Sequence, residues 1–172
     1  CRVRHAREIR RGAEDVSAEQ TLKKARTLLK NGDVRGAEKL ILSQWPKAAS
    51  APAEACFIAG KARLAQRQFA AAAALFDHAA RQDPRPVYVF ALGDARMLQG
   101  AAPAAADAFA RVLDLDPNFP NARRAFARVA LSAERFAEAE ASARMLIAER
   151  PDADAWNILS VALRGQERLE EA

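Results

Sequence analysis

The chain has 172 residues and a formal net charge of +5; 51% of its residues are hydrophobic, but only 6% are aromatic. A chain of this length can bury a core of its own, and its apolar content excludes an intrinsically disordered protein. Much of the apolar fraction is alanine, and no stretch alternates apolar and polar residues over the length of a strand, so the composition predicts an all-helical fold.

Residues 1–17 precede the first regular pattern and form a basic arm or helix. Five arginines fall within the first eleven positions. Such a segment is typical of a solvated terminus, or of a contact with an anionic partner. It has no aromatic residues that could stack on nucleotide bases, and we expect no nucleic-acid partner.

Further along, the segments FDHAARQDP (76–84) and FARVLDLDP (109–117) are one pattern that occurs twice, with Phe, Asp and Pro at matching places. The same frame extends over most of the chain. Three full copies contain, in order, Gly60, Ala72, Phe76, Ala79 and Pro84; then Gly93, Ala105, Phe109, Val112 and Pro117; then Ala127, Phe136, Ala139, Leu146 and Pro151. Leu28, Gly32, Val34 and Ala37 fit an earlier copy, and Trp156, Leu159, Ser160, Leu163 and Leu169 open a later one.

Each copy reads as two amphipathic helices joined by a short turn, near residues 66–68, 99–101 and 133–135. Small residues such as Gly93 let two helix backbones approach closely, and we expect Phe76 and Phe109 to fill the space between repeats. Proline ends the second helix of each copy, because it cannot donate a hydrogen bond and clashes with the preceding turn.

This pattern resembles the tetratricopeptide repeat, a helix–turn–helix unit of about 34 residues. The resemblance extends from about residue 18 to residue 172 and implies an all-α fold, a right-handed solenoid of stacked repeats. The repeats would span about 18–52, 53–85, 86–119, 120–152 and 153–172, the last one truncated. The Ala- and Arg-rich, Lys-poor composition is typical of a bacterium with a GC-rich genome.

The family resemblance also implies a non-catalytic scaffold that binds another protein on the concave face, which the first helices line. The family's ligand positions correspond here to Arg26, Lys30, Phe57, Lys61, Leu64, Phe90, Asp94, Met97, Asn121, Arg124, Arg128 and Asn157. This strip has basic ends and an apolar middle, so we expect a partner peptide with acidic flanks and an apolar centre. We also expect Arg124 and Arg128 to be exposed, so that reversing their charge changes stability little.

Two arginines depart from the family pattern. Arg63 and Arg96 stand at the same place in consecutive copies, at a position that is usually apolar. Either their stems pack while their charged ends reach water, or a buried ion pair forms, for example between Arg63 and Asp94.

No residues form a recognisable catalytic or cofactor motif. The chain has no Gly-rich phosphate loop, and His5 and His78 share no predicted site. Cys1 and Cys56 lie far apart without a CxxC motif. We therefore expect no enzyme activity, no metal site and no cofactor.

Two alternative roles remain open. A chain that begins with Cys1 is compatible with a mature bacterial lipoprotein, lipidated at that residue, acting in assembly of pili or secretins in the envelope. The chain could instead be the N-terminal module of a larger enzyme such as a sulfotransferase or glycosyltransferase. The sequence leaves the compartment open between cytoplasm and periplasm, and we expect outer-membrane anchoring and membrane contact only if Cys1 is lipidated.

Overall fold

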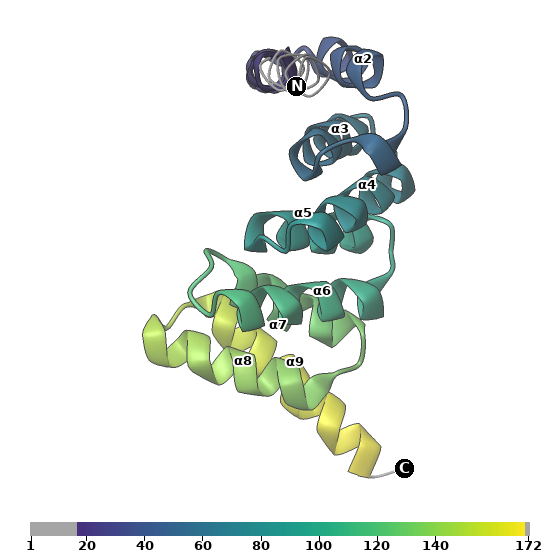
Figure 1. The fold of residues 1–172 in the computed structure, drawn as a ribbon. Helices are drawn as coiled ribbons and strands as arrows, with labels where there is room; N and C mark the ends of the chain where they lie inside the picture. The colour runs from purple at the N-terminus through teal and green to yellow at the C-terminus, as the bar shows by residue number, and fades with distance from the viewer. Residues whose placement is uncertain (1–16, 171–172) are drawn as a thin grey trace, which may run out of the picture. The chain divides into compact units, whose positions relative to one another are not determined.

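The computed structural model describes the backbone of residues 17–170 and the side chains of residues 17–166, and this part of the chain contains helices and no strand. A helix covers residues 17–30. It is followed by α2 (Val34–Gln44), the 3₁₀ turn η1 (Ala48–Ser50), α3 (Ala53–Ala65), α4 (Phe69–Gln82), α5 (Pro86–Leu98), α6 (Ala102–Leu115), α7 (Ala122–Ser132), α8 (Phe136–Glu149) and α9 (Ala153–Glu170) (Figure 1). None of the described helices is both long enough and apolar enough to span a bilayer.

The chain divides into two compact bodies, one ending at Asp83 and the other beginning at Pro84. We call them the N-terminal and C-terminal bodies. Within each body, helices that are consecutive in sequence pack on each other, as α3 does on α4 and α5 on α6. The sequence frame placed these helix pairs and their turns correctly, because a regular period fixes where both helices of each copy must begin.

The helix at residues 17–30 and the first helices α3, α5 and α7 are each followed, within two residues, by a residue with left-handed backbone geometry. These residues are Gly32 (φ 83°), Arg67 (φ 61°), Gly100 (φ 83°) and Glu134 (φ 59°). The following amide then bonds back to the last turn, as where the Ala101 amide donates to the Arg96 carbonyl oxygen at 2.9 Å. This is the Schellman arrangement, which satisfies carbonyl groups at the helix end and reverses the chain.

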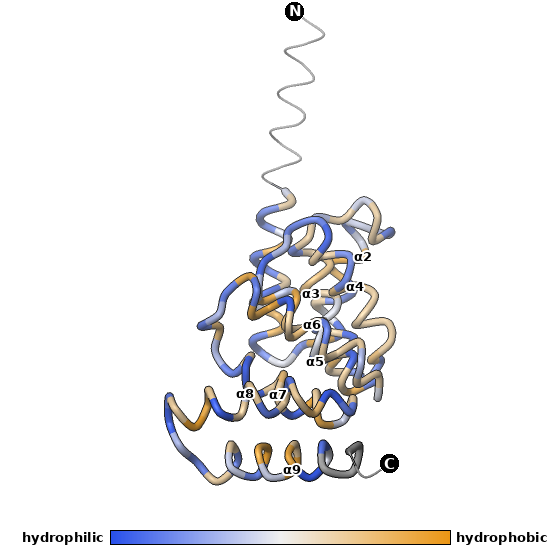
Figure 2. Tube along the Cα trace, turned by 90° about the horizontal axis from the view of Figure 1, so that it is seen from below, coloured by the Kyte–Doolittle hydropathy of each residue, from blue (hydrophilic) through white to orange (hydrophobic). Residues whose placement is uncertain are grey.

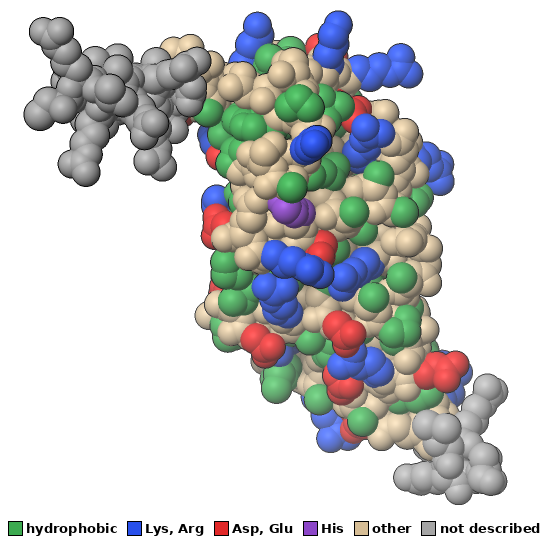
Figure 3. All heavy atoms as spheres, turned by 45° about the vertical axis from the view of Figure 1, so that its right-hand side comes forward, with side chains coloured by type: hydrophobic (Ala, Val, Ile, Leu, Met, Phe, Trp, Pro, Cys, Tyr) green, Lys and Arg blue, Asp and Glu red, His purple; other side chains and the backbone are tan. Residues whose placement is uncertain are grey.

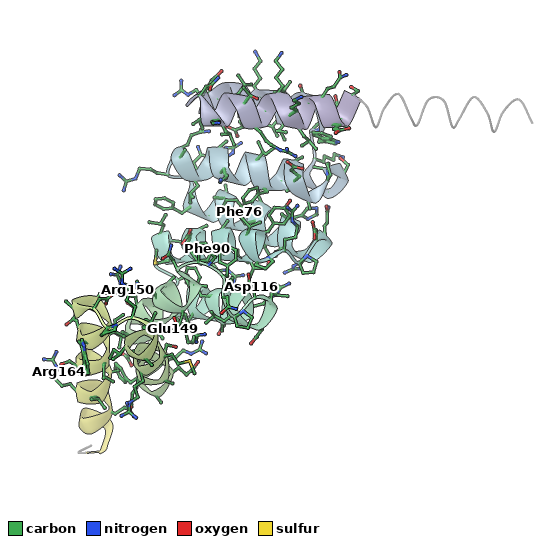
Figure 4. The ribbon with its side chains drawn as sticks, turned by 90° about the vertical axis from the view of Figure 1, so that its left-hand side faces the viewer. Phe76, Phe90, Asp116, Glu149, Arg150 and Arg164 are labelled. Atoms are coloured by element: carbon green, nitrogen blue, oxygen red, sulfur yellow. The ribbon has the colours of Figure 1, made fainter. Side chains whose placement is uncertain are left out.

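Glycines on the first helices lie directly under aromatic rings of the second helices. A Cβ atom added to Gly60 would lie 2.5 Å from Cε1 of Phe76, which Figure 4 labels. A Cβ atom added to Gly93 would lie 2.7 Å from Cε1 of Phe109. Both rings are fully buried. Glycine is required because any side chain would occupy the volume of the ring.

The next repeat solves the same packing problem differently. Its first helix carries Ala127 where α3 and α5 carry glycine, and its second helix carries Ala143 in place of the phenylalanine. Both alanines are fully buried in the core of the C-terminal body, together with Phe126 and Ile158. Two alanines here replace a glycine and an aromatic ring.

Candidate partner-binding surface

The first helix of the C-terminal body, α5, exposes two large apolar side chains in its last turn. Met97 is 43% exposed and Leu98 is 49% exposed. Asp94, about one helical turn earlier, is half-buried and has no hydrogen-bond or ion-pair partner within the described residues. Burial raises the pKa of the Asp94 carboxyl to about 6, since desolvation disfavours the charged form.

Phe90, which the sequence placed in the same strip, is mainly engaged in packing. Its ring centroid lies 5.2 Å from that of Phe109 on α6 and 5.3 Å from that of Phe119 in the loop before α7. These separations are typical of aromatic pairs. Phe90 is half-buried, so only part of its ring is available to a partner (Figure 4).

Two arginines on α7 bind the acidic first turn of α9. Arg124 Nη2 lies 2.7 Å from Asp152 Oδ2, and its Nη1 lies 2.6 Å from Asp154 Oδ2. Arg128 Nη2 lies 2.6 Å from Asp154 Oδ1. Asp152 also caps α9, accepting a hydrogen bond from the Ala155 amide at 2.8 Å.

These contacts change the charge of this end of the strip. Hydrogen bonds from the arginines hold the pKa of Asp152 and of Asp154 below the usual range, and the pKa of Arg124 is raised by the same bonds. The Arg124 side chain is 27% exposed and that of Arg128 is 60% exposed. The expectation that both arginines are exposed is therefore wrong for Arg124, which binds two carboxylates and is only 27% exposed. In the lower part of Figure 3, acidic and basic side chains lie close together.

The two asparagines predicted in the strip lie at different places on the C-terminal body. Asn121 immediately precedes α7, is exposed, and has left-handed geometry with φ of 62°. Asn157 is exposed on α9. The structure records no hydrogen bond from either side chain within the described residues, so both amides are accessible.

In the N-terminal body, the predicted strip residues of α3 form a small cluster. The Phe57 ring packs against the Phe76 ring, with centroids 5.7 Å apart, and Lys61 Nζ lies 5.1 Å from the Phe57 centroid. The latter is a cation–π distance. Leu64 is half-buried and Lys30 is exposed. Arg26 is exposed and forms an ion pair with Glu54.

The sequence left the environment of Arg63 open, and the structure shows that Arg63 forms an ion pair within the N-terminal body. Arg63 Nε lies 2.5 Å from Glu38 Oε1 on α2, and the other Glu38 oxygen accepts a hydrogen bond from Gln66 at 2.6 Å. The Arg63 side chain remains 33% exposed. Its ion pair thus joins neighbouring helix pairs. Arg96, the equivalent residue on α5, donates to the Ala104 carbonyl oxygen at 3.2 Å.

The remaining candidate residues form no site. Cys1, the possible lipid attachment residue, and His5 lie outside the described residues. Cys56 is buried in α3, and burial raises the pKa of its thiol, which makes it unreactive. Within the described residues, no three His, Cys, Asp or Glu side chains gather in a way that could hold a metal ion.

Sequence reasoning missed Asp152, Asp154 and Glu38 as ion-pair partners. A signal was present, because oppositely charged residues recur 28 positions apart: Arg26 with Glu54, Arg124 with Asp152, and Asp107 with Arg135. A spacing of 28 positions is slightly shorter than one repeat. It therefore places a charged side chain of one helix near the beginning of the equivalent or a neighbouring helix in the next repeat.

Comparison with known proteins agrees with this architecture. Two family models described as "Tetratricopeptide repeat" match residues 59–120 and residues 96–162. Together these matches cover more than half of the chain. The chain belongs to the tetratricopeptide-repeat family. Its fold class is therefore the predicted one, an all-α array of helix–turn–helix repeats.

Several solved tetratricopeptide-repeat structures share this fold. YrrB, described as "a TPR protein with an unusual peptide-binding site", has a TM-score of 0.78 and 20% identity, over 94% of this chain and 83% of its own. MamA has a TM-score of 0.75 and 19% identity, over 90% and 85%. A repeat protein from Parabacteroides merdae has a TM-score of 0.73 and 14% identity, over 90% and 62%. No curated protein matches the chain.

Proposed function

We propose that this tetratricopeptide-repeat chain is a non-catalytic scaffold that binds a segment of another protein on the faces of its first helices. The observation that carries the proposal is on α5, where Met97 and Leu98 are exposed beside the half-buried carboxyl of Asp94. Exposed apolar side chains next to a polar group of this kind are typical of protein-interaction surfaces. The description of YrrB as a peptide-binding protein of the same fold supports it.

The partner segment that fits best has an apolar centre, which would cover Met97 and Leu98. An acidic group beside it would pair with Arg128, whose side chain is 60% exposed and has one carboxylate partner. Arg124 is less available, because it already binds two carboxylates. An acidic partner must compete with Asp154 for Arg128, so its charge would contribute mainly to the rate of association.

Under the same proposal, the predicted partner-binding residues of the N-terminal body also contact the partner. Phe57 and Lys61 present an aromatic face and a cation together, which suits a partner with apolar and acidic groups. Lys30, Arg26 and Leu64 complete this part of the strip.

The proposal is tested by selecting peptides from a random display library on the immobilised chain and measuring their affinity by fluorescence anisotropy. We expect the enriched peptides to share an apolar centre. Met97→Glu and Leu98→Glu should weaken binding by about tenfold or more each, since they place a charge in the apolar contact.

Leu115→Glu is the matched control, because Leu115 is 43% exposed on α6, a second helix. This change should leave peptide affinity unaltered. If Leu115→Glu abolishes binding while both α5 variants bind normally, the partner uses the second helices and the proposal is wrong. Failure of the library to yield any peptide with an apolar centre would also contradict it.

A further inference from the structure

Asp94 is a half-buried acidic residue of α5 for which the described part of the chain supplies no partner. Helix α5 carries only two charged residues, Asp94 and Arg96, among mostly apolar ones (Figure 2). Arg96 donates a hydrogen bond to the Ala104 carbonyl oxygen, whereas the Asp94 carboxyl has no such bond within the described residues. Native proteins usually pair a carboxylate that is withdrawn from water, because its lost hydration is otherwise uncompensated.

The charged side chains of the neighbouring helices in the C-terminal body are engaged elsewhere. On α6, which packs against α5, Asp107 binds Arg135. On α7, Arg124 and Arg128 bind the acidic first turn of α9. Burial is accordingly the cause of the raised pKa of the Asp94 carboxyl. The other charged residues of α6 and α7 do not bond to it either: Arg111, Asp114 and Arg123.

The equivalent residues of two other first helices are cations that have partners within the chain. In the repeat frame, Asp94 corresponds to Lys61 on α3 and to Arg128 on α7. Lys61 Nζ lies 5.1 Å from the centroid of the Phe57 ring, and Arg128 Nη2 lies 2.6 Å from Asp154 Oδ1. Of these three positions, only that of Asp94 carries a negative charge. A cation that pairs with it would therefore come from a bound partner.

Apolar side chains border the Asp94 carboxyl on the same side of α5. Phe90 and Leu98 stand four positions before and after it, and Met97 stands beside Leu98, so these residues share one helix face. Met97 and Leu98 are exposed, and the Phe90 ring, labelled in Figure 4, is half-buried. A carboxylate amid apolar surface attracts a cation more strongly than a fully hydrated one does, because less water screens the pair.

We propose that the partner segment bound on α5 places an arginine or lysine side chain, flanked by apolar residues, on the Asp94 carboxyl. This inference rests on the proposed function and adds a basic residue to the apolar centre of the partner. Arginine fits best, because its guanidinium can donate two parallel hydrogen bonds to a carboxylate and stack on an aromatic ring such as that of Phe90. With a basic residue over α5 and an acidic group toward Arg128 on α7, the order of charges would fix the direction of the segment.

The experiment is to run the peptide selection in parallel on the parent chain, on Asp94→Asn and on Asp94→Lys. Peptides enriched on the parent should carry an arginine or lysine next to the apolar centre. That preference should disappear on Asp94→Asn, and an acidic residue should replace the basic one on Asp94→Lys, because the charge at this position is then reversed. Asp114→Asn is the matched control, since Asp114 is an exposed acid on the second helix α6, and it should select the same peptides as the parent.

Affinities measured by fluorescence anisotropy test the contact itself. For a peptide selected on the parent, Asp94→Asn should weaken binding about tenfold, and replacing the basic residue of the peptide by glutamine should weaken it equally. Both changes together should cost no more than either alone, because they remove the same contact. Affinity for the parent should fall from pH 7 to pH 5, since burial raises the pKa of Asp94 to about 6 and the protonated carboxyl no longer attracts a cation. Affinity for Asp94→Asn should not.

The outcomes distinguish this inference from the function on which it rests. If Met97→Glu weakens the selected peptides but they contain no basic residue, the inference is wrong and the proposed function stands. A basic residue that is equally preferred on Asp94→Asn also overturns the inference, because that residue then binds elsewhere. A library that yields no peptide with an apolar centre overturns both.

Discussion

Replacing Gly93 by alanine tests the packing on which the repeat frame depends. The new Cβ atom would lie 2.7 Å from Cε1 of Phe109 and 2.9 Å from both Cδ1 and Cζ. The ring cannot move freely, because it is fully buried and packs edge-on against Phe90 with centroids 5.2 Å apart. Insertion of a methyl group into such a packed space costs about 1–3 kcal/mol.

The net effect is smaller than this cost, since alanine is favoured over glycine inside a helix by about 1 kcal/mol. We therefore expect Gly93→Ala to destabilise the chain by about 1 kcal/mol. In the background Phe109→Ala the ring is absent and only the helix preference remains. There Gly93→Ala should stabilise by up to about 1 kcal/mol, so the sign of the effect reverses. Ala127 and Ala143 already form such a pair in the next repeat.

The assay is urea denaturation followed by far-UV circular dichroism for the parent, both single variants and the double variant. Gly100→Ala is the control, because an added Cβ meets nothing within 4 Å there and the strain comes from a φ of 83°. Its cost should be the same with or without the Phe109 ring. An effect of Gly93→Ala with equal sign and size in both backgrounds would refute the packing argument.

Three further predictions concern charge and backbone geometry. Arg124→Gln should lower the melting temperature by about 2–4 °C. Hydrogen bonds from the arginines lower the pKa of Asp152 and of Asp154 in the folded chain, so this contribution to stability is complete above the ordinary aspartate pKa of about 3.9 and is lost as the pH falls below it; thermal melts at several pH values measure this. Glu134→Gly should raise the free energy of unfolding by about 0.5–1 kcal/mol, because Glu134 holds a φ of 59° that glycine adopts without strain; a lower denaturation midpoint would contradict this. Asp94→Asn should stabilise the chain by about 1 kcal/mol at pH 7 and should have no effect at pH 4. Burial raises the pKa of Asp94 to about 6, so the parent chain loses stability as the pH rises through that value and the carboxyl ionises. Equal denaturation midpoints for parent and variant at pH 7 would contradict this.

The repeat period shows how much of the fold the sequence determines. Gly93 and Phe109 stand one full repeat after Gly60 and Phe76, and proline follows each second helix. These residues fix helix ends and contacts through local geometry, which depends on spacing alone. The turn at Gly100 was predictable for the same reason, whereas the left-handed geometry of Glu134 was not, because glutamate gives no local signal for it.

Ion-pair partners were decided by the tertiary structure. Arg63 pairs with Glu38 on α2, and Arg124 with Asp152 and Asp154 on α9. An arginine side chain has many rotamers and a long reach, so the sequence allows several partners for it. Only the packing of neighbouring helix pairs selects one of them.

The same distinction applies to the surfaces proposed for binding. The sequence by itself determined which residues stand on the first helices, because repeat position follows from the period. It did not determine that the Arg124 side chain is only 27% exposed while that of Arg128, about one helical turn later, is 60% exposed. Burial depends on which helix packs over a residue, and that neighbour belongs to the tertiary structure and not to the local pattern.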